Sequence, residues 1–157
     1  MDKAALRQAM VERLEAELAV LVAAANTSKD EATDQESRQE GKYDMRGQSA
    51  AYLAAGQAKL ATELAEAIAA YRSLSVAPGS AGAAVAIGSL VTLESPRQRT
   101  LYFIGPARGG AVLDLGGALV TVITALSPVG RQLVGQRAGS AVKLPGPGPA
   151  ATIAAVD

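Results

Sequence analysis

The sequence from 28 to 44 reads Ser28-Lys29-Asp30-Glu31-Ala32-Thr33-Asp34-Gln35-Glu36-Ser37-Arg38-Gln39-Glu40-Gly41-Lys42-Tyr43-Asp44. Apart from Ala32 and Tyr43 it has no apolar side chain, so it cannot belong to a core. Ser28 and Glu31 have the spacing of a capping box, as do Thr33 and Glu36, and this spacing is typical of a helix start. We therefore expect a polar turn here, with a second helix beginning near residue 34.

Apolar stripes with helical spacing flank this polar stretch on both sides. The stripe before it consists of Leu6, Met10, Leu14, Leu18, Leu21 and Ala25. The stripe after it has the spacing of a heptad seam and consists of Leu53, Leu60, Leu64, Ala67, Tyr71 and Leu74. Because each stripe is narrow and needs a partner, they predict an antiparallel α-helical hairpin, a coiled coil, whose first helix spans about residues 3 to 27.

Beyond the hairpin the apolar spacing changes to that of strands. Segments 89–94, 99–104, 111–115, 118–124, 141–144 and 152–156 have this pattern. Ser127-Pro128 opens a short helix that runs through Val134, with Gly135 as its C-cap. These features predict an α+β chain: a helical hairpin over 1–75, a linker over 76–88, and a small antiparallel β domain with one short helix over 89–157.

The composition excludes several classes of function. The chain has no cysteine and no histidine, which excludes disulfides, thiol nucleophiles, Cys/His zinc sites and imidazole bases. It has no apolar run of about 18 residues and no secretory leader pattern at its start, so we expect a cytoplasmic protein without membrane contact. Residues 1–74 hold 12 acids and 9 bases, and residues 75–157 hold 3 acids and 6 bases, an asymmetry that points to a partner with more than one kind of surface.

A family resemblance comes from the segment Ser127-Pro128-Val129-Gly130-Arg131-Gln132-Leu133-Val134-Gly135-Gln136-Arg137-Ala138-Gly139-Ser140-Ala141-Val142. It resembles the C-terminal signature of the Gre family of bacterial transcription factors: Ser-Pro, a small residue, a base, an aliphatic pair, Gly-Lys, then Gly-Asp and a β-branched strand. Gln136 stands where Lys is usual, and Ser140 where Asp is usual. The resemblance implies an FKBP-like β domain after a helical hairpin.

The same resemblance implies a function. Gre factors bind RNA polymerase, insert the hairpin into its secondary channel, and help to hold a catalytic Mg²⁺ so that the polymerase cuts its own backtracked RNA. Glu40 matches the family's tip Glu, and Asp34 or Glu36 would replace the tip Asp, whose position is taken here by Ser37. Asp34, Glu36 and Glu40 are thus the expected catalytic acids. Asp34 and Glu40 are the expected ligands of a Mg²⁺ that is shared with the polymerase.

The remaining assignments follow from this role. The chain would be no enzyme itself, bind no cofactor or small-molecule substrate on its own, and contact nascent RNA only indirectly. Lys42 and Arg46 would touch RNA phosphates or the channel wall, and Arg131 and Arg137 would belong to a basic docking surface. Three alternatives stay open: a channel-binding regulator without cleavage, a coiled-coil interaction module without polymerase contact, and a peptidyl-prolyl isomerase, which needs an aromatic-lined pocket.

Overall fold

The computed structural model describes the backbone of residues 2–36, 45–77, 79, 82–96, 98–144 and 150–157. It describes the side chains of the same residues except 28–36 and 45–51. Two compact units divide the chain. One unit is Glu12–Ile68, and the other combines Met1–Val11 with Ala69–Asp157. The predicted domain boundaries at 75 and 88 stay predictions.

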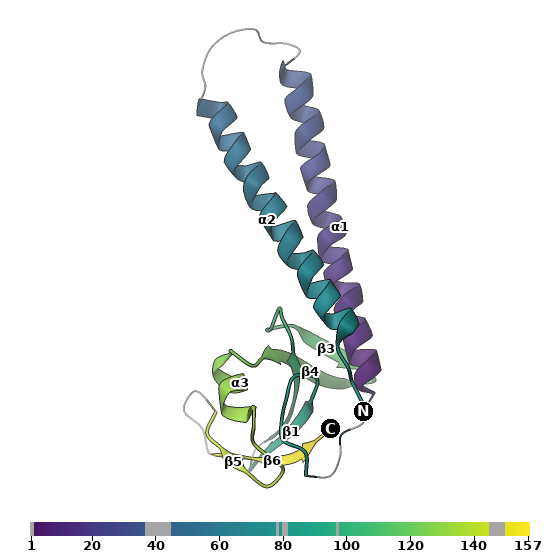
Figure 1. Cartoon of the computed structure of the whole chain (residues 1–157), viewed down its shortest axis with the longest axis vertical. Helices are drawn as coiled ribbons and strands as arrows, with labels where there is room; N and C mark the ends of the chain where they lie inside the picture. The colour runs from purple at the N-terminus through teal and green to yellow at the C-terminus, as the bar shows by residue number, and fades with distance from the viewer. Residues whose placement is uncertain (1, 37–44, 78, 80–81, 97, 145–149) are drawn as a thin grey trace. The chain divides into compact units, whose positions relative to one another are not determined.

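Two long helices make up most of the N-terminal half, α1 (Lys3–Glu36) and α2 (Met45–Ser73) (Figure 1). The Asp2 carboxylate caps α1 by accepting from the Ala4 N–H at 2.8 Å. The prediction that the first helix ends near residue 27 and the second begins near residue 34 is wrong, because both Ser/Thr-x-x-Glu spacings lie inside α1. Residues 29–36 are rich in Lys, Glu, Gln and Ala, which have high helix propensity. The helix therefore continues through both capping-box spacings and does not end before them.

The apolar stripes are buried at only one end of the unit Glu12–Ile68. Leu14 and Leu64 are almost fully buried, as are Ala67 and Ile68. By contrast, Leu53 is 63% exposed and Leu60 is 37% exposed. The seam predicted to run from Leu53 to Leu74 is therefore buried near Leu64 and exposed toward Leu53, and the coiled coil stays a prediction.

Six strands within the described residues form one sheet, in the order β3-β4-β2-β1-β6-β5. They are β1 (Leu90–Ser95), β2 (Gln98–Gly105), β3 (Val112–Leu115), β4 (Ala118–Thr124), β5 (Ala141–Val142) and β6 (Ala151–Val156). The expected all-antiparallel arrangement is wrong, because β2 and β4 pair in parallel, with Leu101 opposite Val120. The β3–β4 hairpin turns at Gly116-Gly117, both at positive φ, and places β3 at the sheet edge, so β4 returns alongside β2 in the same direction.

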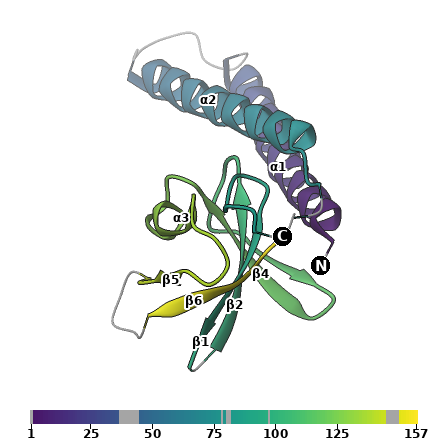
Figure 2. The same ribbon diagram turned by 60° about the horizontal axis from the view of Figure 1, so that its bottom comes forward.

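The sheet buries apolar residues on both faces. Helix α3 (Pro128–Leu133) covers one face, where Leu133 packs in a cluster with Val91, Leu93 and Ile104 (Figure 2). The other face carries Leu90, Phe103, Val120 and Val122, all buried. Leu6, Met10 and Tyr71, from the helix ends that belong to this unit, are also fully buried. The α+β class is confirmed, and the FKBP-like assignment stays a prediction.

Among the helices that the structure describes, none combines the length and the apolar composition needed to cross a bilayer.

Candidate functional site

Most of the predicted site residues lie in or next to the segment between α1 and α2. Asp34 and Glu36 belong to the last turn of α1, and Arg46 belongs to the first turn of α2. Glu40 and Lys42 lie in the segment 37–44, outside the described residues. The backbone therefore places two predicted acids and one predicted base at the helix ends that this segment joins.

The helical backbone limits what the two acids on α1 can do together. Residues two positions apart in an α-helix are rotated by about 200° around the axis. The Cα atoms of Asp34 and Glu36 therefore lie on nearly opposite sides of α1, which disfavours joint binding of one ion by this pair. No group of three or more acidic, His or Cys residues in the described parts of the chain could hold a metal ion. The predicted Mg²⁺ ligation by Asp34 and Glu40 stays a prediction.

The Ser-Pro segment builds α3 as its sequence predicts. The Ser127 hydroxyl accepts from the Gly130 N–H at 2.9 Å and donates to the Thr124 carbonyl at 2.8 Å. Pro128 stands at the start of the helix, where no N–H is needed. A Cβ atom on Gly130 would overlap the Thr124 carbonyl. The helix can therefore dock on the end of β4 only because residue 130 is glycine.

Backbone hydrogen bonds of the residues after α3 connect this helix to the stretch before β1 and to the strand β6. Gly135, at φ 83°, donates to the Val85 carbonyl at 2.8 Å, and the Val85 N–H donates to the Gln136 carbonyl at 2.8 Å. Farther along, the Gly139 N–H donates to the Ile153 carbonyl at 2.8 Å. This segment thus fixes the stretch before β1 and the strand β6 onto α3. Its conformation is a structural requirement of the sheet unit.

The two arginines predicted for docking have different surroundings. Arg131 is exposed in the last turn of α3. The Arg137 guanidinium donates to the Gly82 carbonyl and so also holds the linker in place. Arg131 forms no ion pair with a described residue, whereas substitution of Arg137 would disturb the linker as well as any docking surface.

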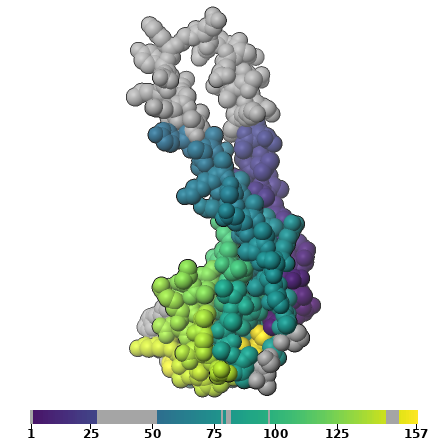
Figure 3. Space-filling model, viewed as in Figure 1, coloured from purple at the N-terminus to yellow at the C-terminus, as the bar shows by residue number. Residues whose placement is uncertain are grey.

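An apolar surface that the sequence reasoning missed lies beside Arg131. Leu126 is 81% exposed and Val134 is 38% exposed. Leu126 precedes the cap Ser127, where an apolar residue usually packs against the fourth helical position. That position is occupied by Arg131, so Leu126 has no apolar partner there. The pair Leu126 and Arg131 is therefore the signal in the sequence from which the exposure of Leu126 could have been predicted. We call Leu126, Arg131 and Val134 the α3 surface. The segment around α3 belongs to the green part of the chain in Figure 3.

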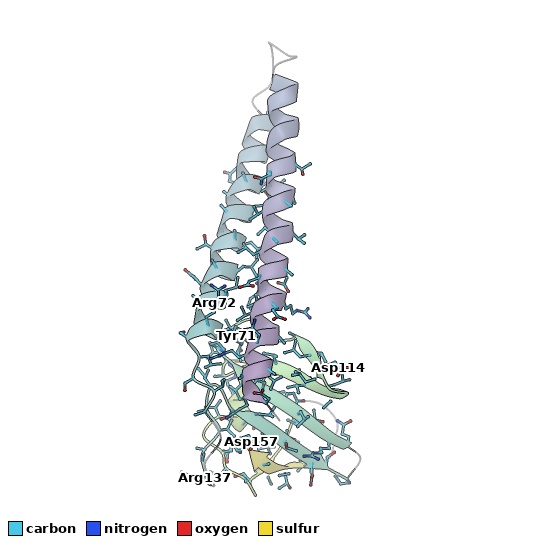
Figure 4. The ribbon with its side chains drawn as sticks, turned by 90° about the vertical axis from the view of Figure 1, so that its right-hand side faces the viewer. Tyr71, Arg72, Asp114, Arg137 and Asp157 are labelled. Atoms are coloured by element: carbon cyan, nitrogen blue, oxygen red, sulfur yellow. The ribbon has the colours of Figure 1, made fainter. Side chains whose placement is uncertain are left out.

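Tyr71 anchors the loop between β2 and β3, whereas the sequence placed it in a helix seam. Its hydroxyl donates to the Ala107 carbonyl at 2.8 Å, and Figure 4 labels it on α2. A side chain on Gly105 would overlap that hydroxyl. Burial raises the pKa of Tyr71 to about 12, because the interior disfavours the phenolate. The same loop holds Arg108 at φ 54°, an unusual conformation for a residue with a side chain.

A groove of about 640 Å³ lies on the sheet, lined by Leu90, Thr92, Arg99, Leu101, Ala118, Leu119 and Asp157. None of these described lining residues is aromatic. Phe103, the chain's only phenylalanine, is fully buried and cannot line an open pocket. The groove therefore lacks the aromatic walls expected of a prolyl isomerase site, which argues against that alternative.

Comparison with known proteins gives similarity only at the level of solved structures. No protein-family model matches the chain, and no curated protein does. A structure of the transcription factor Gfh1 is 24% identical, with 93% of this chain and 92% of that chain covered and a TM-score of 0.40. GreA factor homolog 1 (Gfh1) of Thermus thermophilus is 18% identical, with 94% of each chain covered and a TM-score of 0.40. Gfh1 of Thermus aquaticus is 18% identical, with 92% of each chain covered and a TM-score of 0.38.

Proposed function

We propose that this chain is a Gre-like transcription factor that binds bacterial RNA polymerase and places the segment between α1 and α2 in the secondary channel. The observation that carries the proposal is the unbroken run of α1 to Glu36 and the start of α2 at Met45. Within the unit Glu12–Ile68, each helix extends over about 35 Å at 1.5 Å per residue. The polar segment 37–44 therefore joins two helices of matched length, which suits insertion into a narrow pore.

The α3 surface is the proposed contact with the rim of that channel. It combines two exposed apolar side chains, Leu126 and Val134, with the positive charge of Arg131. Apolar and arginine side chains together are enriched at protein interfaces. The hydrogen bonds of Ser127 and the glycine at 130 hold the surface rigid, which lowers the entropic cost of docking.

Within this role, we favour a channel-binding regulator over a factor that stimulates RNA cleavage. Mg²⁺ binding by the tip needs carboxylates that reach one ion together. Ser37 occupies the position of the family's tip Asp, and Asp34 and Glu36, which lie on nearly opposite sides of α1, cannot both replace it. Cleavage stimulation is the second candidate, and it depends on Glu40 with Asp34. The Mg²⁺ would then be shared with the polymerase, whose own nuclease activity would cut the RNA.

Backtracked elongation complexes test the proposal. The full chain is added with Mg²⁺, and polymerase binding, RNA shortening and the rate of nucleotide addition are measured. The regulator predicts binding and slower nucleotide addition, with no RNA shortening above the basal rate. RNA shortening that Glu40→Gln or Asp34→Asn abolishes would instead establish the cleavage factor.

A matched control separates the tip from general charge effects. Glu66→Gln removes an exposed carboxylate from α2. It should leave binding and nucleotide addition unchanged. Absence of any polymerase binding would contradict both candidates and leave the coiled-coil interaction module.

A further inference from the structure

A small polar pocket is lined by the first turn of α1, by the stretch that leads into β1 and by the residues at the end of β6. Its volume is about 200 Å³, and its lining includes Lys3, Ser75, Ser89 and Asp157. All of its lining residues belong to the compact unit that contains the sheet. The pocket therefore forms within one unit, and it contains none of the residues assigned to the polymerase contact.

Lys3 is the unusual residue of this pocket. It is only 8% exposed, and it forms no hydrogen bond or ion pair with a described residue. Within the described parts of the chain, no fully buried side-chain nitrogen or oxygen atom lacks a partner. The Lys3 ammonium therefore keeps some access to solvent, and the pocket that Lys3 lines provides it. A nearly buried cation without a protein partner favours the binding of an anion.

Contacts outside the pocket hold its segments together. The Arg7 guanidinium donates to the Leu74 carbonyl at 3.0 Å, which fixes the residue before Ser75 to α1. A Cβ atom on Gly88 would come within 2.9 Å of the Ser75 carbonyl oxygen, so glycine at this position lets the two backbone segments lie close. The pocket is therefore formed before a ligand enters, which lowers the entropic cost of binding.

The pocket offers several hydrogen-bond donors and one charged acceptor. The Ser89 oxygen accepts from the Ala86 N–H at 3.0 Å, which leaves its hydroxyl proton for a ligand. Ser75 adds a second hydroxyl, and Lys3 adds the N–H groups of its ammonium. Asp157, labelled in Figure 4, is exposed, and its carboxylate forms no ion pair with a described residue. A ligand that satisfies these groups needs several acceptor oxygens and one hydrogen to donate to the carboxylate.

A protonated phosphate group has this combination. Phosphate has several strong acceptor oxygens, and its second pKa in a monoester is about 6, so near this pH many groups keep one P–OH hydrogen. Sulfate has a similar shape but no such hydrogen, so its charge would face the Asp157 carboxylate without a hydrogen bond. The volume is below the roughly 300 to 1,000 Å³ of sites for drug-sized ligands, which suits a single phosphate group.

We propose that this pocket binds a protonated phosphate group, with Lys3 and the two serines donating to its oxygens and Asp157 accepting from its P–OH. The group is inorganic phosphate or the phosphate of a small monoester. The proposal is independent of the proposed polymerase binding, because it uses neither the segment 37–44 nor the α3 surface.

Calorimetric titration of the full chain with inorganic phosphate at about pH 6 and constant ionic strength tests the proposal. We expect saturable binding with a dissociation constant of roughly 1 mM or below. Sulfate should bind at least about tenfold more weakly, because it cannot donate to Asp157. Titration with glycerol phosphate distinguishes the two sources. Tighter binding than that of inorganic phosphate identifies the monoester, and weaker binding identifies the free ion.

Three variants test the roles of the charged residues. Lys3→Met removes the ammonium but keeps a long side chain, and it should weaken phosphate binding by about tenfold or more. Lys59→Met is the matched control, because it removes the same charge from an 80% exposed side chain in the other unit, and it should leave binding unchanged. Asp157→Asn replaces the carboxylate by a neutral amide that can donate, so sulfate should then bind within about threefold of phosphate.

The proposal is overturned if phosphate binding does not saturate up to roughly 20 mM, if the original chain binds sulfate as tightly as phosphate, or if Lys3→Met binds phosphate with unchanged affinity. Circular dichroism verifies that every variant is folded. Because Asp157 is exposed, the sulfate comparison with Asp157→Asn tests the pocket even if Lys3→Met does not fold. Polymerase binding measured separately shows whether the other proposal stands.

Discussion

At the scale of single residues, Gly130 and Ser127 determine how α3 meets the sheet. The Ser127 hydroxyl bonds both to the helix it caps and to the carbonyl of Thr124 at the end of β4. The same carbonyl occupies the space that a Cβ on residue 130 would need. A small residue at this position is thus a packing requirement, and the Ser-Pro segment needs no catalytic role to explain it.

Gly130→Ala should lower the free energy of unfolding by about 2 kcal/mol or more, because a backbone carbonyl cannot move away as a flexible side chain can. Urea denaturation of the full chain measures the change. The matched control is Gly56→Ala in α2, where the added methyl group meets no other atom. That substitution should raise stability by up to about 1 kcal/mol through helix propensity. Equal effects of the two substitutions would contradict the packing argument.

Tyr71→Phe should cost about 1 kcal/mol at neutral pH, because it removes the bond to the partly buried Ala107 carbonyl. A pH dependence follows as well. The unfolded chain loses the phenolic proton near pH 10.0, whereas the folded chain holds it to about 12. The raised pKa therefore contributes stability that is fully present below pH 10.0 and is lost as the pH rises toward 12.

Urea titrations between pH 9 and pH 12 can measure this loss, with a slope of at most roughly 1.4 kcal/mol per pH unit. At each pH the unfolding free energy of Tyr71→Phe is subtracted from that of the original chain, and the slope of this difference against pH is measured. The subtraction cancels the contribution of the other tyrosines. Parallel stability curves for the two proteins over this range would show that burial of Tyr71 does not favour its neutral form.

At the scale of elements, sequence periodicity locates the strands well. The predicted strands agree with the observed ones to within about two residues, and the Ser-Pro helix appears where its cap and glycine place it. The order of strands was not predictable in the same way. Local patterns describe which residues alternate, but the parallel β2–β4 pair depends on where the β3 hairpin docks, a contact between distant residues.

The helix boundaries failed for a different reason. Ser28 and Thr33 have cap spacing, yet a cap stabilises a helix start only if the chain breaks there. Helix formers continue through Glu36, so the backbone hydrogen bonds favour one longer α1. Asp34 and Glu36 therefore lie on α1 and not in the predicted turn. The consequence for the site, acids on nearly opposite sides, could not be foreseen without that boundary.

The uneven burial of the helix seam gives a prediction with a built-in control. Leu64 is 2% exposed, whereas Leu53, in the same helix and the same predicted stripe, is 63% exposed. Leu64→Ala should destabilise the chain by about 2 to 5 kcal/mol, and Leu53→Ala should change stability by less than about 0.5 kcal/mol. Thermal or urea unfolding followed by circular dichroism at 222 nm, the usual helix signal, distinguishes them. Similar losses for both would indicate a seam that continues toward the turn.

At the scale of the whole molecule, the chain combines features that serve binding. The described residues offer no three-residue metal cluster, and the groove on the sheet has no aromatic wall. What the chain does offer is a pair of long helices joined by a polar segment, an α3 surface with exposed Leu126, and a groove with charges of both signs. We propose that the helices and the α3 surface serve as surfaces for another macromolecule.

Polymerase docking should depend on the α3 surface. Leu126→Asp places a charge in its exposed apolar part without touching a buried contact, since the side chain is 81% exposed. It should weaken polymerase binding by about tenfold or more while leaving the unfolding free energy within about 0.5 kcal/mol of the original. Leu119→Asp, which places the same charge on an exposed leucine of β4, is the matched control, and it should leave polymerase binding unchanged. Unchanged binding by Leu126→Asp would exclude the α3 surface from the contact.

The most direct measurement is a competition for core bacterial RNA polymerase. The chain, labelled at its N-terminus, is bound to the polymerase, and an authentic Gre factor is then added while fluorescence anisotropy reports the bound fraction. If both proteins use the secondary channel, the Gre factor should displace the labelled chain completely. The Gre-factor concentration that displaces half of the labelled chain should rise with the concentration of the labelled chain. Simultaneous binding of both proteins, or no binding of the chain at all, would contradict the account.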